Sequence, residues 1–422
     1  MKNFILKGDT VYSLNNRKLV TNKDSYLVCL DGVSKGVYES IPEEYKTLEV
    51  IDHTGCLIIP GFNDLHVHAS QYQYRGTGMD VELLEWLEKY AFNEERKFQD
   101  VEYAKKAYKM FVDEIKKGFT TRLSVFATSH KDATLELMRQ LDESGVVSYV
   151  GLVEMDRNAA PGVQQESVEK ALKDTEEYIV ESQKYKLSKP IITPRFLPTC
   201  SDELMEGLSL VRKKYNVPTQ SHLDENPDEI AFVMELEKDV NNYSEGYSKF
   251  DMFGKDHNCI MAHCIYNNDE EIQMLKDNNI FVAHCPESNL NIASGIAPIA
   301  KYLDNEINVG LGSDVAGGST LSLLRAARQA IQVSKMYYRY IDKSQRLLDS
   351  KDAFYLLTLG GGKFFGKVGS FLDGYEFDAV VVNDNLIPHL RDFTLEERLE
   401  RLLYIGDESL IASKYVQGRK II

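Results

Sequence analysis

The stretch Pro60-Gly61-Phe62-Asn63-Asp64-Leu65-His66-Val67-His68 gives the strongest structural signal in the chain, because it ends in two histidines one residue apart. Side chains alternate across a β-strand, so His66 and His68 are predicted to point to the same side and to bind one metal ion together. An apolar run at 57–59 precedes the stretch, and Pro60-Gly61 indicates a turn between them. Two structural histidines would explain the pair equally well, so the prediction depends on the segments that follow.

A strand-then-helix rhythm continues from about residue 60 to about residue 366. Helices are predicted at 100–117, which is followed by Gly118, and after a capping box from Asn268 to Glu271. The candidate strands are short and rich in apolar and β-branched residues, which is typical of buried parallel strands. They lie at 62–65, 120–125, 146–153, 191–195, 218–222, 259–263, 281–284 and 308–312. Eight strands alternating with helices predict an α/β fold, a (β/α)8 TIM barrel rather than an open sheet.

The two ends of the chain lack this rhythm. They contain short alternating segments, such as 19–30 and 378–382, which are typical of antiparallel strands. Since the barrel interrupts them, we expect the ends to pair into one small β-sandwich domain. The predicted organisation is a discontinuous β domain of residues 1–59 and 369–422, with a catalytic barrel domain of residues 60–368.

The composition of the chain argues against several classes of function. The chain has 422 residues, of which 43% are hydrophobic and 27% charged, as in ordinary globular proteins. A net charge of −16 disfavours nucleic acid and anionic membranes as partners, because both attract basic surfaces. Six scattered cysteines without a Cys-x-x-Cys pair indicate reduced thiols. With no apolar run long enough to span a bilayer and no secretory signal, we expect a cytoplasmic protein.

Metal-type side chains occur at the ends of four separate candidate strands. His66 and His68 are followed by His222, His263 and Asp314. Because the C-terminal strand ends of a TIM barrel face the active site, these side chains are predicted to converge. Singly, each histidine could be a hydrogen-bonded core group, and Asp314 could cap a helix. Together and in this order they favour a Zn²⁺ or Fe²⁺ site that activates a water molecule.

Several further motifs accompany these residues. They are Ala69-Ser70-Gln71, Leu83-Leu84-Glu85-Trp86-Leu87, Thr193-Pro194-Arg195-Phe196, Ser221-His222 with Glu225-Asn226, Met261-Ala262-His263, His284-Cys285-Pro286 with Ser288-Asn289-Leu290, Gly312-Ser313-Asp314-Val315-Ala316-Gly317-Gly318, and Thr358-Leu359-Gly360-Gly361. Over essentially its whole length the chain resembles the amidohydrolase superfamily and, within it, the guanine deaminases. The segments at 69–71 and 194–196 are what narrow the resemblance to guanine.

The resemblance implies a role for each matching residue. It implies one Zn²⁺ per subunit, with Fe²⁺ as the alternative, and no second metal. The implied metal ligands are His66, His68, His222 and Asp314. The implied catalytic residues are Glu225 for proton transfer, His263 for orienting or polarising the attacking water, and the ligand Asp314. The implied guanine contacts are Gln71, Arg195, Phe196 and His263.

The implied reaction is hydrolytic deamination of guanine to xanthine and ammonia. The residue types suit a flat purine: Arg195 offers a planar fork of donors to the 6-carbonyl side, and Gln71 can donate and accept. Phe196 supplies an aromatic surface. The structural alternatives are that Arg195 pairs with a carboxylate of this acidic protein and that Phe196 belongs to the core.

Other functions remain open at this stage. The main alternative is a related deaminase or hydrolase acting on another amino-heterocycle, such as a triazine or pterin, and a remote one is a non-catalytic scaffold. Base deaminases of nucleic acids use His-x-Glu with Pro-Cys-x-x-Cys, which the chain lacks. Glu287 and Ser313 depart from the family pattern, which has asparagine and threonine there, so fine specificity is a separate question. The resemblance further implies a homodimer.

Two other features have more ordinary interpretations. His284 ends a candidate strand and is predicted to support the site rather than to bind the metal. The aromatic run at 336–340 is predicted to be a helix face at a subunit contact or in the core. His53, His130, His257 and His389 are interpreted as structural or solvated.

Overall fold

The barrel predicted from the strand rhythm is present in the structure, a computed structural model that describes residues 3–422. Eight parallel strands form one sheet in the order β11-β12-β13-β14-β5-β6-β7-β9. Ile192 closes the ring, because its N–H donates to the carbonyl of Pro218 and its carbonyl accepts from Gln220, each at 3.0 Å. The strands are β5 (Phe62–His68), β6 (Thr120–Phe126), β7 (Val147–Gly151), β9 (Ser188–Pro190), β11 (Thr219–Leu223), β12 (Cys259–His263), β13 (Phe281–His284) and β14 (Asn308–Leu311).

Neither of the predicted strands at 146–153 and 191–195 forms one continuous strand with those bounds, so the bounds were wrong there. The first becomes β7 followed by β8 (Val153–Glu154), and the second is replaced by β9 and β10 (Thr193–Pro194). β8 and β10 pair with each other in a separate two-stranded sheet. Pro190 and Pro194 lack the N–H group that a ladder requires, which interrupts a continuous strand here.

The helices predicted from their capping signals begin and end as expected. The Asp100 side chain accepts hydrogen bonds from two backbone N–H groups of α3 (Val101–Lys117), and Gly118 ends that helix. The capping box from Asn268 to Glu271 opens α9 (Asp269–Asp277). The other helices surrounding the barrel are α4 (Lys131–Ser144), α5 (Val168–Ser182), α6 (Asp202–Tyr215), α11 (Ile299–Asp304), α12 (Leu323–Tyr340) and α13 (Ser350–Tyr355). α13 continues into the π-helical turn η6 (Leu356–Gly360).

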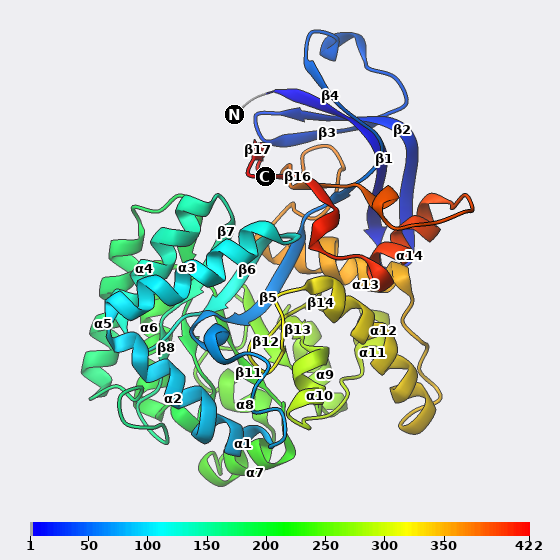
Figure 1. The fold of residues 1–422 in the computed structure, drawn as a ribbon. Helices are drawn as coiled ribbons and strands as arrows, with labels where there is room; N and C mark the ends of the chain where they lie inside the picture. Colours follow the sequence, from blue (N-terminus) through cyan, green and yellow to red (C-terminus); the bar gives the residue numbers. More distant parts are fainter. Residues whose placement is uncertain (1–2) are drawn as a thin grey trace.

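Both ends of the chain contribute to a second, seven-stranded sheet beside the barrel (Figure 1). Its order is β17-β16-β15-β4-β1-β2-β3. β15 pairs antiparallel with β4, and their partners Ala379 and Pro60 are 319 positions apart in the sequence. The sheet is mixed, because β1 and β4 are parallel. Its strands are β1 (Phe4–Asn15), β2 (Lys18–Leu30), β3 (Val33–Tyr38), β4 (Glu49–Pro60), β15 (Ala379–Val382), β16 (Ile411–Val416) and β17 (Arg419–Lys420). Helix α14 (Leu395–Ile405) connects β15 to β16.

Buried contacts join this sheet to the barrel. Within the small domain itself, Phe4 packs against Phe377 and Tyr415, with ring centroids 5.4 and 5.2 Å apart, which holds the two chain ends together. A second set of contacts reaches the barrel. Lys414 of β16 donates to the carbonyls of Ile115, Gly118 and Thr120 at 3.1, 2.6 and 3.0 Å. The C-terminal strands are therefore anchored to the end of α3 and the start of β6.

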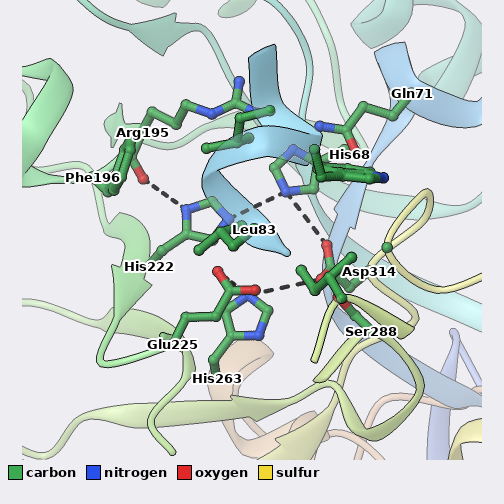
Figure 2. Close-up of a pocket in the computed structure, with 14 residues that line it drawn as sticks. His68, Gln71, Leu83, Arg195, Phe196, His222, Glu225, His263, Ser288 and Asp314 are labelled. Carbon is green, nitrogen blue, oxygen red and sulfur yellow. Dashed lines mark hydrogen bonds and ion pairs between the residues drawn. The ribbon is translucent and has the colours of Figure 1, made fainter. Parts of the chain in front are cut away.

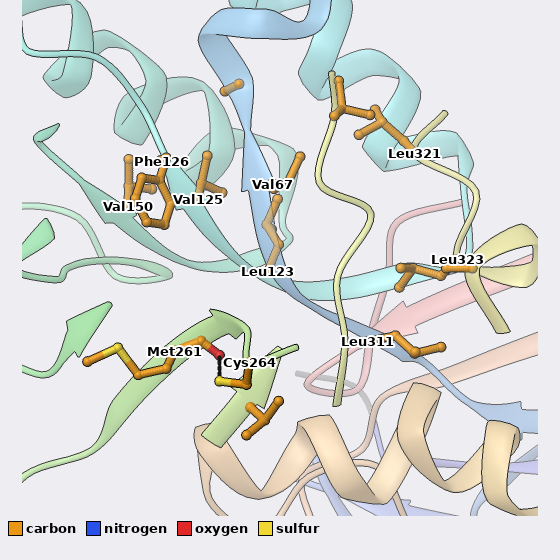
Figure 3. Packing of buried hydrophobic residues seen from close by; sticks show 14 of the residues in the cluster. Val67, Leu123, Val125, Phe126, Val150, Met261, Cys264, Leu311, Leu321 and Leu323 are labelled. Carbon is orange, nitrogen blue, oxygen red and sulfur yellow. Dashed lines mark hydrogen bonds between the residues drawn. The ribbon is translucent and has the colours of Figure 1, made fainter. Parts of the chain in front are cut away.

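Buried apolar side chains of the barrel strands pack against one another and their surroundings (Figure 3). Val67, Leu123, Val125, Phe126 and Leu311 belong to one continuous buried cluster. A second buried cluster includes residues of β5, β12 and β13. In barrels of this kind the ligand site lies at the C-terminal ends of the strands.

Short helices lie at the end of the barrel remote from the small sheet (Figure 1). They follow the C-terminal ends of the strands, where a ligand site is expected. They include η2 (Ala69–Tyr74), α1 (Leu83–Trp86), the π-helical turn η3 (Leu87–Ala91), α2 (Phe92–Glu95), α7 (Pro227–Leu236), α8 (Tyr243–Ser248) and α10 (Pro286–Asn291). Within residues 3–422, no helix combines the length and apolar character that crossing a membrane requires. The six cysteines are all free thiols.

Candidate metal centre and purine pocket

Four side chains from three strands meet at the C-terminal end of the barrel, and Figure 2 labels His68, His222 and Asp314 among them. His66 and His68 lie on β5, His222 lies on β11, and Asp314 follows β14. The Nε2 atom of His68 lies 3.2 Å from Nε2 of His66 and 3.3 Å from Nε2 of His222. The Oδ1 atom of Asp314 lies 3.2 Å from Nε2 of His66 and 3.5 Å from Nε2 of His68. The four predicted ligands are thus brought together.

The four separations given above, 3.2–3.5 Å, are close to those between ligands on one tetrahedral ion. Ligand atoms held about 2.0–2.1 Å from such an ion stand about 3.3–3.4 Å apart. The tautomer of His222 supports the fit, because its Nδ1 atom lies 2.7 Å from the carbonyl of Arg195 and must therefore carry the proton. Its Nε2 atom then presents a lone pair to the neighbouring imidazoles. A cation between them satisfies these lone pairs.

The ionisation of the cluster also suits a metal. Burial, followed by the charges of neighbouring histidines, holds the pKa values of His68 and His222 well below the usual range, so both are neutral imidazoles. Burial tends to raise the pKa of Asp314, but His66 and the hydrogen bonds around it bring that pKa down to about 2. Neutral imidazoles and an ionised carboxylate are the forms that bind divalent transition metals.

His263 and Glu225 lie beside these four residues. The Nε2 atom of His263 is 3.4 Å from Oε2 of Glu225 and 3.7 Å from Oδ2 of Asp314. Burial, followed by the charges of Glu229 and Asp314, raises the pKa of Glu225 well above its usual range. Burial lowers the pKa of His263 to about 4. A carboxyl group that holds a proton near neutrality thus stands beside a neutral imidazole, which suits proton transfer.

His263 also lies within ligand reach of the same cluster. One ring nitrogen of His263 lies within 4.8 Å of ligand atoms of both His66 and His222. A second such set consists of His263, Cys285 and Asp314, whose ligand atoms also lie within 4.8 Å of one another. Cys285 was not among the predicted site residues, although it stands in a quoted motif. Its buried thiol has a pKa raised well above the usual range, first by burial and then by nearby carboxylates, so a neutral thiol is favoured there.

The loop that presents Asp314 is fixed by β5. Asp314 donates its N–H to the carbonyl of His66 at 2.9 Å, and His68 donates its N–H to Val315 at 3.1 Å. A Cβ at Gly312 would lie 2.9 Å from the Cβ of His66, so only glycine permits this close approach. Asp314 has a φ of 45° and follows β14 in this loop, where it does not cap a helix.

Ser313, which departs from the family pattern, makes a defined contact. Its hydroxyl donates to Asp64 Oδ2 at 2.6 Å, and its N–H donates to Oδ1 of the same carboxylate at 3.0 Å. Asp64 also accepts from the N–H of His66 at 3.2 Å. A threonine hydroxyl could make the same bond, so the departure preserves the link between Asp64 and the loop.

Glu287, the second departure, is directed to the protein rather than to the cavity. Its Oε1 atom accepts from the Ser319 hydroxyl at 2.7 Å and pairs with Arg325 of α12 at 2.8 Å. Glu287 is buried, and it is not among the residues that line the pocket. It therefore connects α10 to the start of α12 and to the loop after Asp314.

A cavity with about 390 Å³ of empty space, part of it open to solvent, lies beside the metal-type cluster. The four predicted purine contacts Gln71, Arg195, Phe196 and His263 all line it (Figure 2). Phe196 is also packed in the main apolar cluster, so its structural and binding interpretations are compatible. Further lining residues that were not predicted are Leu83, Trp86, Leu87, Ser288, Ile292 and Gly317.

Arg195 forms the carboxylate pair that was its structural alternative, and it lines the cavity as well. Its NH1 atom donates to Oε2 of Glu95 at 2.7 Å. The other oxygen of Glu95 accepts from Nε2 of Gln71 at 2.9 Å. Glu95 was missed in the sequence, where it stands in a run of charged residues at 94–97 that is typical of a solvated helix.

His284, which ends β13, is buried beside the site. Neither ring nitrogen of the buried His284 has a hydrogen-bond partner within residues 3–422. Burial, followed by the charge of His263, lowers the pKa of His284 to about 3.

His53, His130, His257 and His389 are not among the residues lining the cavity. The run at 336–340 ends α12 with Tyr340 76% exposed, so its last residue is not in the core.

Comparison with known proteins agrees with this geometry. Residues 57–405 match the amidohydrolase family. A guanine deaminase of Dictyostelium discoideum is 35% identical over 99% of this chain and 98% of its own. The human guanine deaminase is 36% identical over 86% and 82% of the two chains. A solved guanine deaminase from C. acetobutylicum with guanine bound in its active site is 47% identical, covers both chains fully and superposes with a TM-score of 0.97.

Proposed function

The chain belongs to the amidohydrolase family, and we propose that it catalyses the hydrolytic deamination of guanine to xanthine and ammonia. The observation that most strongly supports this proposal is a single cavity lined by Gln71, Arg195 and Phe196 on one side and by metal-type residues on the other. Relatives named guanine deaminase that match nearly the whole chain support the same substrate. Glu287 faces away from the cavity, so this departure does not argue against guanine.

We propose that His66, His68, His222 and Asp314 hold one divalent ion per subunit. Three imidazoles and one carboxylate suit Zn²⁺, and Fe²⁺ accepts the same set. When bound, the ion lowers the pKa of water and polarises the group under attack. The chain's contribution is to fix the ligands. His222, for example, is oriented by the carbonyl of Arg195.

Glu225 is the proposed proton carrier. It would take one proton from the attacking water and deliver it to N3 of guanine as the water oxygen bonds to C2. The second proton of that oxygen would pass to the 2-amino group, so the C2–N bond breaks, ammonia leaves and the C2 carbonyl of xanthine forms. Its raised pKa supports this role, because a proton can remain on the carboxyl group during the reaction. His263, oriented by a 2.8 Å contact of Nδ1 with the side-chain Oδ1 of Asn289, would position the water and contact the substrate.

Gln71, Arg195 and Phe196 are the proposed purine contacts. The guanidinium donors of Arg195 suit the 6-carbonyl, and the amide of Gln71 suits the ring edge. Phe196 provides apolar surface for the flat ring. These contacts are remote from C2, so they select and orient the base rather than take part in bond making.

The wider context follows from the same premise. We propose a cytoplasmic enzyme of purine catabolism that acts on free guanine and works as a homodimer, with neither nucleic acid nor membrane as a partner. The proposed domain division is a β domain of residues 1–59 and 369–422 and a catalytic domain of residues 60–368. Pairing of β4 with β15 supports a β domain assembled from both ends.

A substrate panel tests the proposal. Purified protein is incubated with guanine, a 2-amino-triazine or a pterin, and ammonia and the heterocyclic product are quantified. The proposal predicts xanthine and an equal amount of ammonia from guanine, with much slower release from the other two. Preferred turnover of the triazine or pterin would favour the alternative hydrolase. Protein that contains metal but converts none of them would favour a binding role.

A further inference from the structure

Glu95 is a buried carboxylate placed between two of the residues that line the purine side of the cavity. Its Oε1 atom accepts from Gln71 Nε2 at 2.9 Å, and its Oε2 atom accepts from Arg195 NH1 at 2.7 Å. Glu95 is only 2% exposed and is not itself among the lining residues. We propose that Glu95 is a positioning residue that fixes both side chains for recognition of the 6-carbonyl edge of the purine. This inference rests on the function proposed above.

Glu95 determines which way the amide of Gln71 faces. The Gln71 carbonyl oxygen accepts from the N–H of Ala316 at 3.0 Å, and its NH₂ group donates to Glu95 at 2.9 Å. If the amide were reversed, its NH₂ group would face the N–H of Ala316 and its oxygen would face the carboxylate of Glu95, and neither pair can form a hydrogen bond. Only one orientation therefore satisfies both neighbours. It leaves one N–H and one lone pair of Gln71 for a ligand.

Arg195 is held in a similar way. Its backbone carbonyl is fixed by His222 at 2.7 Å, which leaves the long side chain to be placed by other contacts. The guanidinium carbon lies 5.2 Å from the ring centre of Phe92, and one nitrogen donates to Glu95. A guanidinium has five N–H donors, so the bond to Glu95 leaves others for a carbonyl acceptor. Glu95 and Phe92 together restrict the rotation of the group.

The pair also sets the charge at this end of the cavity. Within residues 3–422, Arg195 is the cation that forms an ion pair with Glu95. A buried guanidinium whose charge is already balanced suits a neutral carbonyl, whereas an unbalanced one would favour an anion. This matches a neutral purine with a carbonyl at C6. The negative charge of Glu95 is close enough to contribute, after burial, to raised pKa values of Tyr74 and Tyr108.

Glu95→Gln tests the proposal with little change in shape. A glutamine offers one acceptor oxygen, so either Gln71 or Arg195 would face an N–H group in place of an acceptor. We expect the KM for guanine to rise by about tenfold to a hundredfold, because one or two hydrogen bonds to charged groups are affected. The kcat should change by less than about threefold, since contacts remote from C2 are made equally in the ground and transition states.

Inhibitor binding separates positioning from general damage. Hypoxanthine carries the 6-carbonyl edge and purine lacks it, so the ratio of their inhibition constants measures recognition of that edge. The proposal predicts that Glu95→Gln lowers the preference for hypoxanthine by about tenfold and that Glu95→Asp, which keeps the charge, restores part of it. An equal loss of both inhibitors, or unchanged KM and preference, would overturn the proposal.

Glu94→Gln is the matched control. Glu94 is the preceding residue on α2 and is also buried, but it binds Lys97 at 2.7 Å and the Tyr103 hydroxyl, away from the cavity. It should leave KM and the inhibitor preference unchanged. If the Glu95→Gln protein does not fold, the Glu95→Asp variant alone tests the proposal. Its shorter carboxylate reaches Gln71 and Arg195 less well, so the preference for hypoxanthine over purine must still fall. Guanine turnover by the wild type and by Glu94→Gln tests the proposed function separately from the role of Glu95.

Discussion

The Nε2 atom of His263 lies 3.4 Å from Oε2 of Glu225, while its Nδ1 atom lies 2.8 Å from Oδ1, the amide carbonyl oxygen of the Asn289 side chain. Because a carbonyl only accepts, Nδ1 carries the proton and Nε2 presents a lone pair toward Glu225 and Asp314. The imidazole and the carboxyl group therefore face the same small volume. This relationship makes the roles proposed for both residues testable by separate substitutions.

Replacing the proposed proton carrier should affect chemistry without affecting metal. We expect Glu225→Gln to lower kcat by about 10²–10⁴-fold, because general acid–base catalysis contributes about that much. The metal content should stay at one ion per subunit, since Glu225 is not a proposed ligand. Steady-state kinetics and elemental analysis of the same preparation check both. The exposed Glu235→Gln serves as the control, and near-normal kcat in Glu225→Gln would exclude the proposed role.

Replacing Arg195 should weaken guanine binding. Arg195→Lys keeps the charge but loses the planar fork, so we expect kcat/KM to fall by about tenfold to a hundredfold, mainly through KM. Arg195→Ala also leaves Glu95 buried without its counter-charge, so we expect a lower melting temperature as well. Kinetics with thermal unfolding distinguish the two effects. Guanine turnover retained in full by Arg195→Ala would count against guanine as the substrate.

Two substitutions at Ser313 should have different consequences. Ser313→Ala removes the 2.6 Å bond to the buried Asp64, so we expect the free energy of unfolding to fall by about 1–3 kcal/mol. Ser313→Thr keeps a hydroxyl in the same place and should change stability by much less. Urea unfolding of both variants provides the comparison. Equal losses would show that packing at this position, and not the bond to Asp64, determines its stability.

The buried Lys414 makes stability depend on pH. Burial lowers its pKa from 10.5 to about 7 in the folded protein. Between these values the unfolded chain binds more protons than the folded one, so this group makes the free energy of unfolding increase as pH rises from about 7 to 10.5. Lys414→Met should reduce that slope, and it should lower stability overall because three carbonyls lose their donor. Urea unfolding at several pH values measures both effects, with the exposed Lys186→Met as control. An unchanged slope in Lys414→Met would contradict this assignment.

Much of the fold could be predicted from the sequence because its signals are local. Each of these signals depends only on residues close together in the sequence: the alternation of strands and helices, the capping residues, and the spacing of His66 and His68. The convergence of His222 and Asp314 with that pair followed from the geometry of a closed parallel barrel. The roles of these residues remain predictions until they are tested by substitution.

Features that depend on distant contacts could not be predicted in the same way. Glu94 and Glu95 are adjacent and chemically identical in the sequence, yet one binds Lys97 and the other binds Gln71 and Arg195. The contact of Glu287 with Arg325 depends on how α10 meets α12. The parallel pairing of β1 with β4 likewise depends on tertiary arrangement, since a strand's sequence does not specify its partner's direction.

Chelation and metal restoration with guanine as the substrate test the central claim most directly. Protein treated with a chelator is assayed for xanthine and ammonia before and after addition of one equivalent of Zn²⁺ or Fe²⁺, beside a His66→Ala variant treated identically. The account predicts that activity disappears with the metal and returns at one ion per subunit in the wild type only. Unchanged turnover by metal-free protein would contradict the metal centre, and metal-loaded wild type that leaves guanine intact would contradict the substrate.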